Sequence, residues 1–301
     1  MTITAVILLI FAAITHAGWN FLGKSRHPSV AFLFIANTLG CLCLAPVLFP
    51  YLMVLKSFSA SVWWWLLLTG LCQAVYYAGL AGAYRTGDLS LAYPLARSAP
   101  VIIVTLFNLL AGRGSQLSTQ AIIGMFMVAA GGILMPMEHF SEWRIKRYFK
   151  LSVLFALMAA FGTAGYSLID DHVLRFLRGI PDLPAAPVPT LVYAFFEGVS
   201  SSLFLGAWVL VRRENRVETA QVIRAHFWQS ALAGFGIFLA YTLVLIAMGL
   251  VRNVSYVVAF RQSSILLGTL LGLWALREPC WLPKLIGVAI IFCGLVFVGF
   301  G

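Results

Sequence analysis

The sequence predicts an all-α integral membrane protein with about ten transmembrane helices, built as two inverted five-helix repeats. Three observations support this prediction: an apolar composition, apolar runs of membrane-spanning length, and an internal repeat. Of 301 residues, 61% are hydrophobic and only 10% are charged, and the mean hydropathy is +0.95. Soluble domains carry about 25% charged residues. We therefore exclude a soluble fold.

The apolar residues fall into runs of about 20, the length of helix that crosses a bilayer. Because lipid offers backbone groups no hydrogen-bond partners, each run is expected to be helical. The first run lacks the basic flank of a signal peptide, so we assign it to the mature fold. The proline-rich stretch Pro181–Pro189 is predicted to be a non-helical linker. The predicted spans are 3–22, 30–52, 62–84, 90–111, 118–136, 151–171, 190–211, 228–250, 254–276 and 282–300.

The basic residues are distributed unevenly among the connections. The net charge is +10, which in a soluble protein would suggest nucleic acid as a partner. Here thirteen Lys and Arg residues follow odd-numbered spans and five follow even-numbered spans. Positive residues concentrate on the cytoplasmic side, so both termini are predicted to lie outside. We expect a multi-pass protein of the cell membrane, with lipid rather than nucleic acid as its surroundings.

Residues 1–150 and 151–301 resemble each other and are predicted to be two repeats. An Ala-Ala pair and an Ala-Gly pair followed by an aromatic residue occur near the start of both halves. Because each half holds five spans, an odd number, the second half enters the bilayer in the opposite orientation. Further along, one gapless register pairs Trp64 with Trp228, Gly70 with Gly234, Tyr77 with Tyr241, Ala83 with Ala247, Arg97 with Arg261, Thr105 with Thr269, and Arg113 with Arg277.

The sequence gives no sign of a cofactor, a metal site or ATP binding. The five cysteines form no metal-binding or disulfide pattern. Gly18 to Ser25 matches the letters of a phosphate-binding loop. However, such a loop follows a strand and opens a helix, whereas this stretch ends an apolar helix. ATP-driven transport is therefore not expected.

With the repeat in view, the chain resembles the EamA-type permeases of the drug/metabolite transporter superfamily over essentially its whole length. The resemblance rests on three motifs, of which the first is His16-Ala17-Gly18-Trp19-Asn20 followed by Lys24. The second is the stretch from Gly87 to Pro100, and the third is Arg277-Glu278 before the last span. Many relatives carry a Glu before the fifth span, where this chain has Arg113-Gly114. The resemblance implies transport of a small metabolite and does not name the cargo.

Arg97 and Arg261 are the leading candidates for a binding site. Each lies about two turns inside a predicted span and the register pairs them. An ionisable side chain is costly there, so it faces the interior of the bundle. Two guanidinium groups could bind a carboxylate or a phosphate bidentately. Alternatively, each arginine ties helices together.

Glu197 is the candidate coupling group, because it is the clear carboxylate inside a span. It could exchange a proton during transport, or it could be a permanent counter-ion of an arginine. Asp170 and Asp171, at the end of the sixth span, are predicted to be structural and solvated at the interface.

Further candidates for the substrate-binding wall are polar and aromatic residues near these positions. Tyrosine offers an apolar face and a hydroxyl group, as ligand pockets require. For each residue, ordinary packing is the alternative. The candidates are His16, Trp19, Asn20, Tyr77, Tyr93 and Tyr241.

Together these features predict a secondary transporter that works by alternating access. Its substrate is expected to be a small anionic or zwitterionic metabolite such as an amino acid, with export favoured and protons as the candidate coupling ion. A phosphorylated or phosphonate solute is the alternative cargo. The alternatives of other classes are a membrane enzyme acting on a lipid-linked substrate and a non-transporting scaffold subunit.

Overall fold

The described part of the computed structural model is built from α-helices with two short 3-10 helices, η1 and η2, and contains no strand. It comprises residues 1–24, 29–86, 89–135, 137, 139–140, 151–181, 183–184, 187–275 and 280–301. The elements are α1 (Ile3–Lys24), α2 (Val30–Leu48), η1 (Phe49–Ser57), α3 (Ala60–Arg85), α4 (Leu89–Leu110), η2 (Gly114–Gln116), α5 (Thr119–Leu134), α6 (Leu151–Arg178), α7 (Val188–Val211), α8 (Arg213–Met248), α9 (Val254–Phe260), α10 (Ser263–Ala275) and α11 (Leu282–Phe300).

Polar caps fix the start of several helices. The side chains of Ser29, Ser118 and Asn253 accept hydrogen bonds from backbone N–H groups in the first turns of α2, α5 and α9. These bonds satisfy donors that have no partner within the helix. Proline occupies the first turn of α7 and of α11, where its missing N–H costs nothing. The predicted linker up to Pro189 is therefore two residues too long, because α7 begins at Val188.

Several long apolar helices indicate a membrane-embedded protein. Five described helices are long and apolar enough to cross a membrane, or six if the bent pair Val30–Pro46 and Phe49–Ser57 is one span. Shorter apolar helices cover Ile3–Trp19, Ala96–Leu110 and Thr119–Leu134. Eight of the predicted spans each correspond to a single helix, within a few residues at most ends, and the predicted span 30–52 runs from α2 into η1. The predicted span 254–276 is instead broken into α9 and α10.

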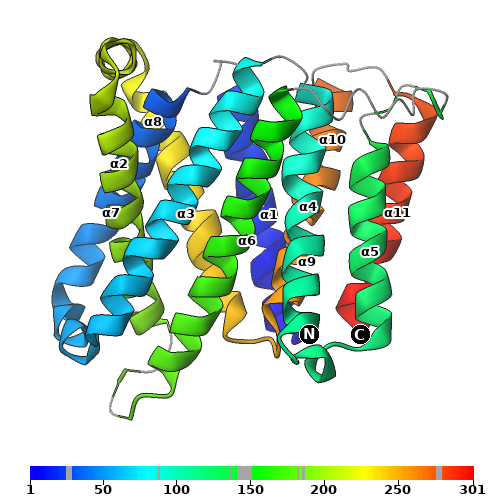
Figure 1. Ribbon diagram of the computed structural model, residues 1–301, viewed down its shortest axis with the longest axis horizontal. Helices are drawn as coiled ribbons and strands as arrows, with labels where there is room; N and C mark the ends of the chain where they lie inside the picture. Colours follow the sequence, from blue (N-terminus) through cyan, green and yellow to red (C-terminus); the bar gives the residue numbers. More distant parts are fainter. Residues whose placement is uncertain are drawn as a thin grey trace.

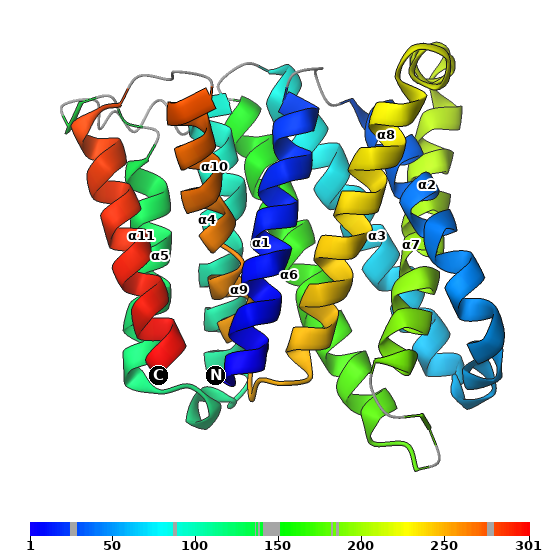
Figure 2. The same ribbon diagram turned by 180° about the vertical axis from the view of Figure 1, so that it is seen from behind.

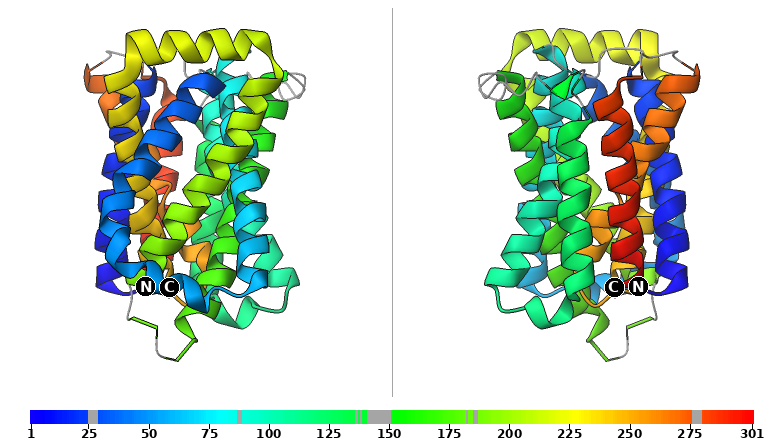
Figure 3. Two further views of the ribbon diagram at one scale, coloured as in Figure 1. Left: turned by 90° about the vertical axis from the view of Figure 1, so that its left-hand side faces the viewer. Right: turned by 90° about the vertical axis from the view of Figure 1, so that its right-hand side faces the viewer.

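The first part of α8 differs from the prediction. The predicted spans 190–211 and 228–250 leave a connection between them, whereas the structure continues α8 back to Arg213 and kinks it at His226, where φ is −134° and ψ is 21°. Figure 3 shows this segment lying across the end of the bundle. The connection is helical because it is rich in good helix formers and contains neither glycine nor proline.

The helices stand side by side, with both termini at the same end of the bundle (Figure 1). Seen from behind, α1 lies between α8 and α10 (Figure 2). The contacts come in matched pairs between the halves. Helix α3 packs on α6 as α8 packs on α1, α2 packs on α8 as α7 packs on α3, and α4 packs on α6 as α10 packs on α1. Helices α5 and α11 pack on each other.

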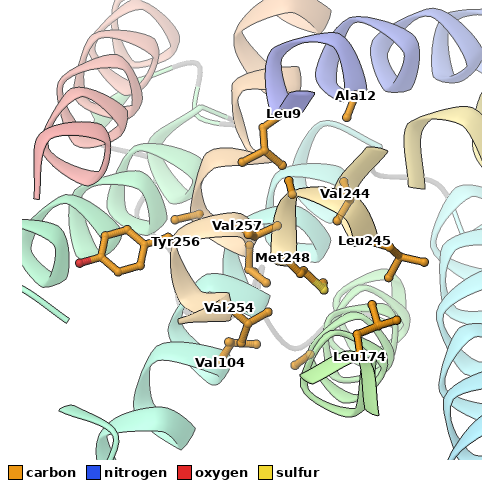
Figure 4. Close-up of a cluster of buried hydrophobic side chains, with 14 of the residues drawn as sticks. Leu9, Ala12, Val104, Leu174, Val244, Leu245, Met248, Val254, Tyr256 and Val257 are labelled. Carbon is orange, nitrogen blue, oxygen red and sulfur yellow. The ribbon is translucent and has the colours of Figure 1, made fainter. Parts of the chain in front are cut away.

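Buried apolar side chains fill the region where α1, α4, α6, α8 and α9 meet, as Figure 4 shows. Leu9, Leu174 and Leu245 are fully buried there, with Val254 and Val257 from α9. Their packing fixes the short helix α9 in the middle of the bundle. This position determines where the chain can present Arg261, the residue that follows α9.

Candidate functional site

A cavity lies among α1, α2, α3, α4, α6, α7 and α8 and the break between α9 and α10. It encloses about 710 Å³ of atom-free space, part of it open to solvent. Like a ligand pocket, it combines an apolar wall with a few polar groups. The polar and aromatic residues of the wall are His16, Trp19, Asn37, Gln73, Tyr76, Tyr77, Arg97, Tyr166, Glu197, Tyr241, Thr242 and Arg261.

Arg261 reaches the cavity from the break between α9 and α10. Its guanidinium carbon lies 5.3 Å from the centre of the Tyr241 ring and 5.9 Å from that of Tyr166. Its Nη2 donates a hydrogen bond to the Tyr166 hydroxyl at 3.3 Å, whereas Nη1 is buried without a hydrogen-bond partner among the described residues. Cation–π contacts hold the group in place. The unpaired Nη1 is available to an anionic ligand.

Arg97, its partner in the repeat, lines the same cavity but has a different environment. Its Nη2 donates to the backbone oxygen of Arg261 at 3.2 Å and to the Ser264 hydroxyl, and its Nε is buried without a hydrogen-bond partner among the described residues. That oxygen also accepts a bond from Ser264 Oγ at 3.0 Å. A cation at the end of a helix stabilises its free carbonyl groups. Arg97 therefore holds the broken helix together, and these bonds favour the helix-tying alternative for this residue.

Four tyrosines gather between the halves. The rings of Tyr76 and Tyr77 are 5.0 Å apart, those of Tyr76 and Tyr166 6.0 Å, and those of Tyr166 and Tyr241 5.3 Å. The repeat mates Tyr77 and Tyr241 thus belong to one aromatic chain along the cavity wall. Tyr76 and Tyr166, which lie near Tyr77 and Tyr241 in sequence or by the repeat, line the same wall.

His16 and Trp19 line the cavity from α1. The Trp19 indole nitrogen donates to His16 Nδ1 at 3.2 Å, and the rings meet edge to face at 5.0 Å. This contact joins residues one turn apart on α1 and orients the imidazole. The side chains of two further candidates, Asn20 and Tyr93, lie outside the described part of the structure, as do the motif residues Arg277 and Glu278.

Glu197, the candidate coupling group, is 1% exposed and lines the cavity. Its Oε1 accepts a hydrogen bond from the Gln73 amide. The described residues place no salt-bridge partner within 4 Å of it. Glu197 is thus held by an amide and is not the direct counter-ion of either arginine.

The prediction that Asp170 and Asp171 are solvated is wrong, because they are 0% and 2% exposed. Asp170 accepts hydrogen bonds from the hydroxyl groups of Thr69, Tyr193 and Tyr241. In Asp171, by contrast, both carboxylate oxygens accept a hydrogen bond from Arg175 Nε, each at 2.9 Å. The buried Asp170 is a candidate that sequence reasoning missed.

No cluster of three or more His, Cys, Asp or Glu side chains suited to holding a metal ion occurs in the part of the chain that the structure describes. The ionisable groups of the cavity are of a different kind. They combine two guanidinium groups, one imidazole, one carboxyl group and several phenols, which can bind a charged organic solute by hydrogen bonds.

The whole fold is similar to that of a solved structure described as "Crystal structure of protein". The likeness covers 100% of this chain and 98% of the other, with a TM-score of 0.69 at 18% sequence identity. At this identity the likeness concerns the fold alone. No family model and no curated protein matches the chain.

Proposed function

We propose that the protein is a secondary transporter that binds a small anionic or zwitterionic metabolite, such as an amino acid, in the cavity around Arg261. The observation that carries the proposal is the buried, unpaired Nη1 of Arg261 beside the cavity. An unpaired buried guanidinium nitrogen is costly. A carboxylate that accepts its hydrogen bond would offset this cost and explain why the residue lies inside the bundle.

The proposed architecture is ten membrane spans in two inverted repeats, 1–150 and 151–301. The matched contacts between the halves support it, because an exchange of α1–α5 with α6–α11 reproduces them. The break between α9 and α10 supports it as well. Transporters of this kind form their binding sites from broken helices near the middle of the membrane. Transport would then proceed by rocking of one half against the other.

The resemblance to EamA-type permeases and the composition point to the same class. We propose the cell membrane as the location and export as the direction. The main alternative cargo is a phosphorylated or phosphonate solute, because a guanidinium group also binds phosphate. A membrane enzyme would need acid, base or metal groups converging at one interface, and the described residues give that reading no support.

The test is transport by purified protein in liposomes. The probes are a panel of radiolabelled amino acids, simple carboxylates, inorganic phosphate and methylphosphonate. We expect saturable movement of one class in the presence of protein, with amino acids favoured. Movement of phosphate or methylphosphonate alone would replace the proposed cargo by the alternative. If protein-containing and empty liposomes behave alike toward the whole panel, the proposed function fails.

A further inference from the structure

Asp170 is a buried carboxyl group that accepts hydrogen bonds from three hydroxyl groups. Its Oδ1 accepts hydrogen bonds from Thr69 Oγ1 and from the Tyr193 hydroxyl, both at 2.7 Å. Its Oδ2 accepts one from the Tyr241 hydroxyl. The three donors come from α3, α7 and α8, so they converge only in the folded bundle. Hydrogen bonds to the charged form favour that form, so we assign the negative charge of this region to Asp170.

Glu197 has the opposite environment, although it lies beside Asp170. Its Oε1 accepts the single bond from Gln73, and its Oε2 is buried without a donor among the described residues. Gln73, the donor to Glu197, lies one turn from Thr69 on α3, and Glu197 lies one turn from Tyr193 on α7, so the groups that hold the two carboxyl groups are neighbours on the same two helices. Thr69 also lies near Glu197, but its single hydroxyl hydrogen is directed to Asp170.

Two ionised carboxylates side by side cannot hydrogen-bond to each other, because neither has a hydrogen to donate. In an apolar interior their charges also repel, so such a pair holds one proton between its members. We propose that Asp170 and Glu197 form a binding site for one exchangeable proton. The proton lies on Glu197 Oε2 and is donated to the ionised Asp170. Binding takes one proton from water and leaves the pair with one negative charge, and release reverses this step.

The charged and titratable groups around the pair do not replace this proton. Asp171 is held by Arg175 and by Arg113, whose Nη1 is 3.9 Å away. Arg261 acts on Glu197 by its charge, but among the described residues its side chain donates to the Tyr166 hydroxyl and not to either carboxyl group. The other facing groups are Cys72 and Tyr77 from α3, Tyr166 from α6, Tyr193 from α7 and Tyr241 from α8.

The position of the pair connects the proton to the cavity. Glu197 is part of the cavity wall, whereas Asp170 is fully buried and is joined to the wall by its hydrogen bond from Tyr241. Tyr241 donates to Asp170 while its ring lies against the guanidinium group of Arg261. A solute that moves Arg261 would therefore disturb the hydrogen bonds of Asp170. This coupling role rests on the proposed function, whereas the proton site itself does not.

The experiment is infrared difference spectroscopy of purified protein in lipid, recorded in H₂O and in D₂O over a pH series. We expect a carbonyl-stretch band of one protonated carboxyl group per chain, which shifts in D₂O and disappears in one single-proton transition as pH rises. Glu197→Gln should abolish the band, since its amide can still donate to Asp170 and preserve the fold. Asp170→Asn, which removes the acceptor, should shift or abolish it. Asp171→Asn is the matched control and should leave it unchanged.

The proposal is overturned if the wild type lacks the band, if the band ignores D₂O, or if it survives in Glu197→Gln. Melting curves show whether each variant is folded, so that a lost band is not mistaken for unfolding. The result is independent of the solute screen. A protein that moves solutes without the band loses only the proton site, and a protein with the band that moves no solute loses only the proposed function.

Discussion

Arg97 and Arg261 occupy equivalent positions in the two halves, but their surroundings differ. Arg97 lies inside the continuous helix α4, whereas Arg261 follows the end of the seven-residue helix α9. Arg97 donates from Nη2 to the Arg261 carbonyl and to Ser264, while its buried Nε has no hydrogen-bond partner among the described residues. Arg261 rests on two tyrosine rings and keeps Nη1 unpaired among the described residues.

The comparison shows how two equivalent residues of a repeat can take different roles. The arginine of the first half stabilises the break in the second half. The break lets the arginine of the second half face the cavity. We therefore expect Arg261 to govern binding and Arg97 to govern stability, and each prediction below tests this division.

The largest effect is expected for Arg261→Gln. Loss of the guanidinium removes the charged donor for the solute, and unpairing a buried charge costs at least about 2 kcal/mol, or roughly 30-fold in affinity. Solute uptake into liposomes at a concentration below saturation should fall by at least that factor. Uptake near the wild-type rate by the folded variant would contradict the assignment of Arg261 to the solute.

Arg97→Gln should mainly destabilise the fold. The shorter side chain loses the bonds to the Arg261 carbonyl and to Ser264, and hydrogen bonds of a charged donor contribute about 1.5–3 kcal/mol. The melting temperature in detergent should fall, while the solutes that stabilise the wild type still act. A variant that melts like the wild type but ignores those solutes would give Arg97 the binding role instead.

The glycine mates Gly70 and Gly234 allow a second comparison of the halves. A Cβ on Gly234 would meet the backbone oxygen of Ala36 at 2.1 Å, and on Gly70 it would meet Ser200 Oγ at 2.1 Å and the backbone carbon of Ser200 at 2.8 Å. Neither clash is relieved unless backbone atoms shift. Gly234→Ala and Gly70→Ala should each cost about 1–3 kcal/mol, as measured by thermal unfolding.

Gly18→Ala is the control for this pair, because a Cβ there would meet nothing within 4 Å. It should melt at or slightly above the wild-type temperature, since alanine favours a helix over glycine. Equal melting temperatures for Gly18→Ala and Gly234→Ala would show that α2 and α8 do not approach closely at Gly234.

The smallest effect is expected for Ser264→Ala. The variant removes one hydrogen-bond partner of Arg97 and one donor to the Arg261 carbonyl, and Arg97 keeps its bond to that carbonyl. A single neutral hydrogen bond contributes about 1 kcal/mol. Combined with Arg97→Gln it should cost less than the sum of the two, because the residues share one network. Strict additivity in this double-mutant cycle would contradict the shared role.

The sequence predicted the helices well because their apolar runs are long and uninterrupted. Runs near 3–22 and 282–300 correspond to α1 and α11 within a few residues. The break at Arg261 was not predictable, since Phe260 to Ser263 contains neither proline nor glycine. It is held by tertiary hydrogen bonds from Arg97 and by local hydrogen bonds of Gln262 and Ser264. Such bonds leave no signal in the hydrophobic periodicity of the sequence.

The candidate site was predicted in part. The register brought Arg97, Arg261, Tyr77 and Tyr241 together, and all four line one cavity. Asp170 was misjudged because its position near the end of an apolar run suggested contact with water. Its hydroxyl partners lie on three other helices, up to 101 residues away in the sequence. Only the packed bundle shows that they converge.

The most direct test of the division between the two arginines is a thermal-stabilisation screen on the wild type, Arg97→Gln and Arg261→Gln. The probes are amino acids, carboxylates, inorganic phosphate and methylphosphonate, because a ligand that binds the folded state raises its melting temperature. We predict that one class stabilises the wild type and Arg97→Gln, from its lower starting temperature, but not Arg261→Gln. If Arg261→Gln responds to the same solutes as the wild type, Arg261 does not bind the solute and the central claim is wrong.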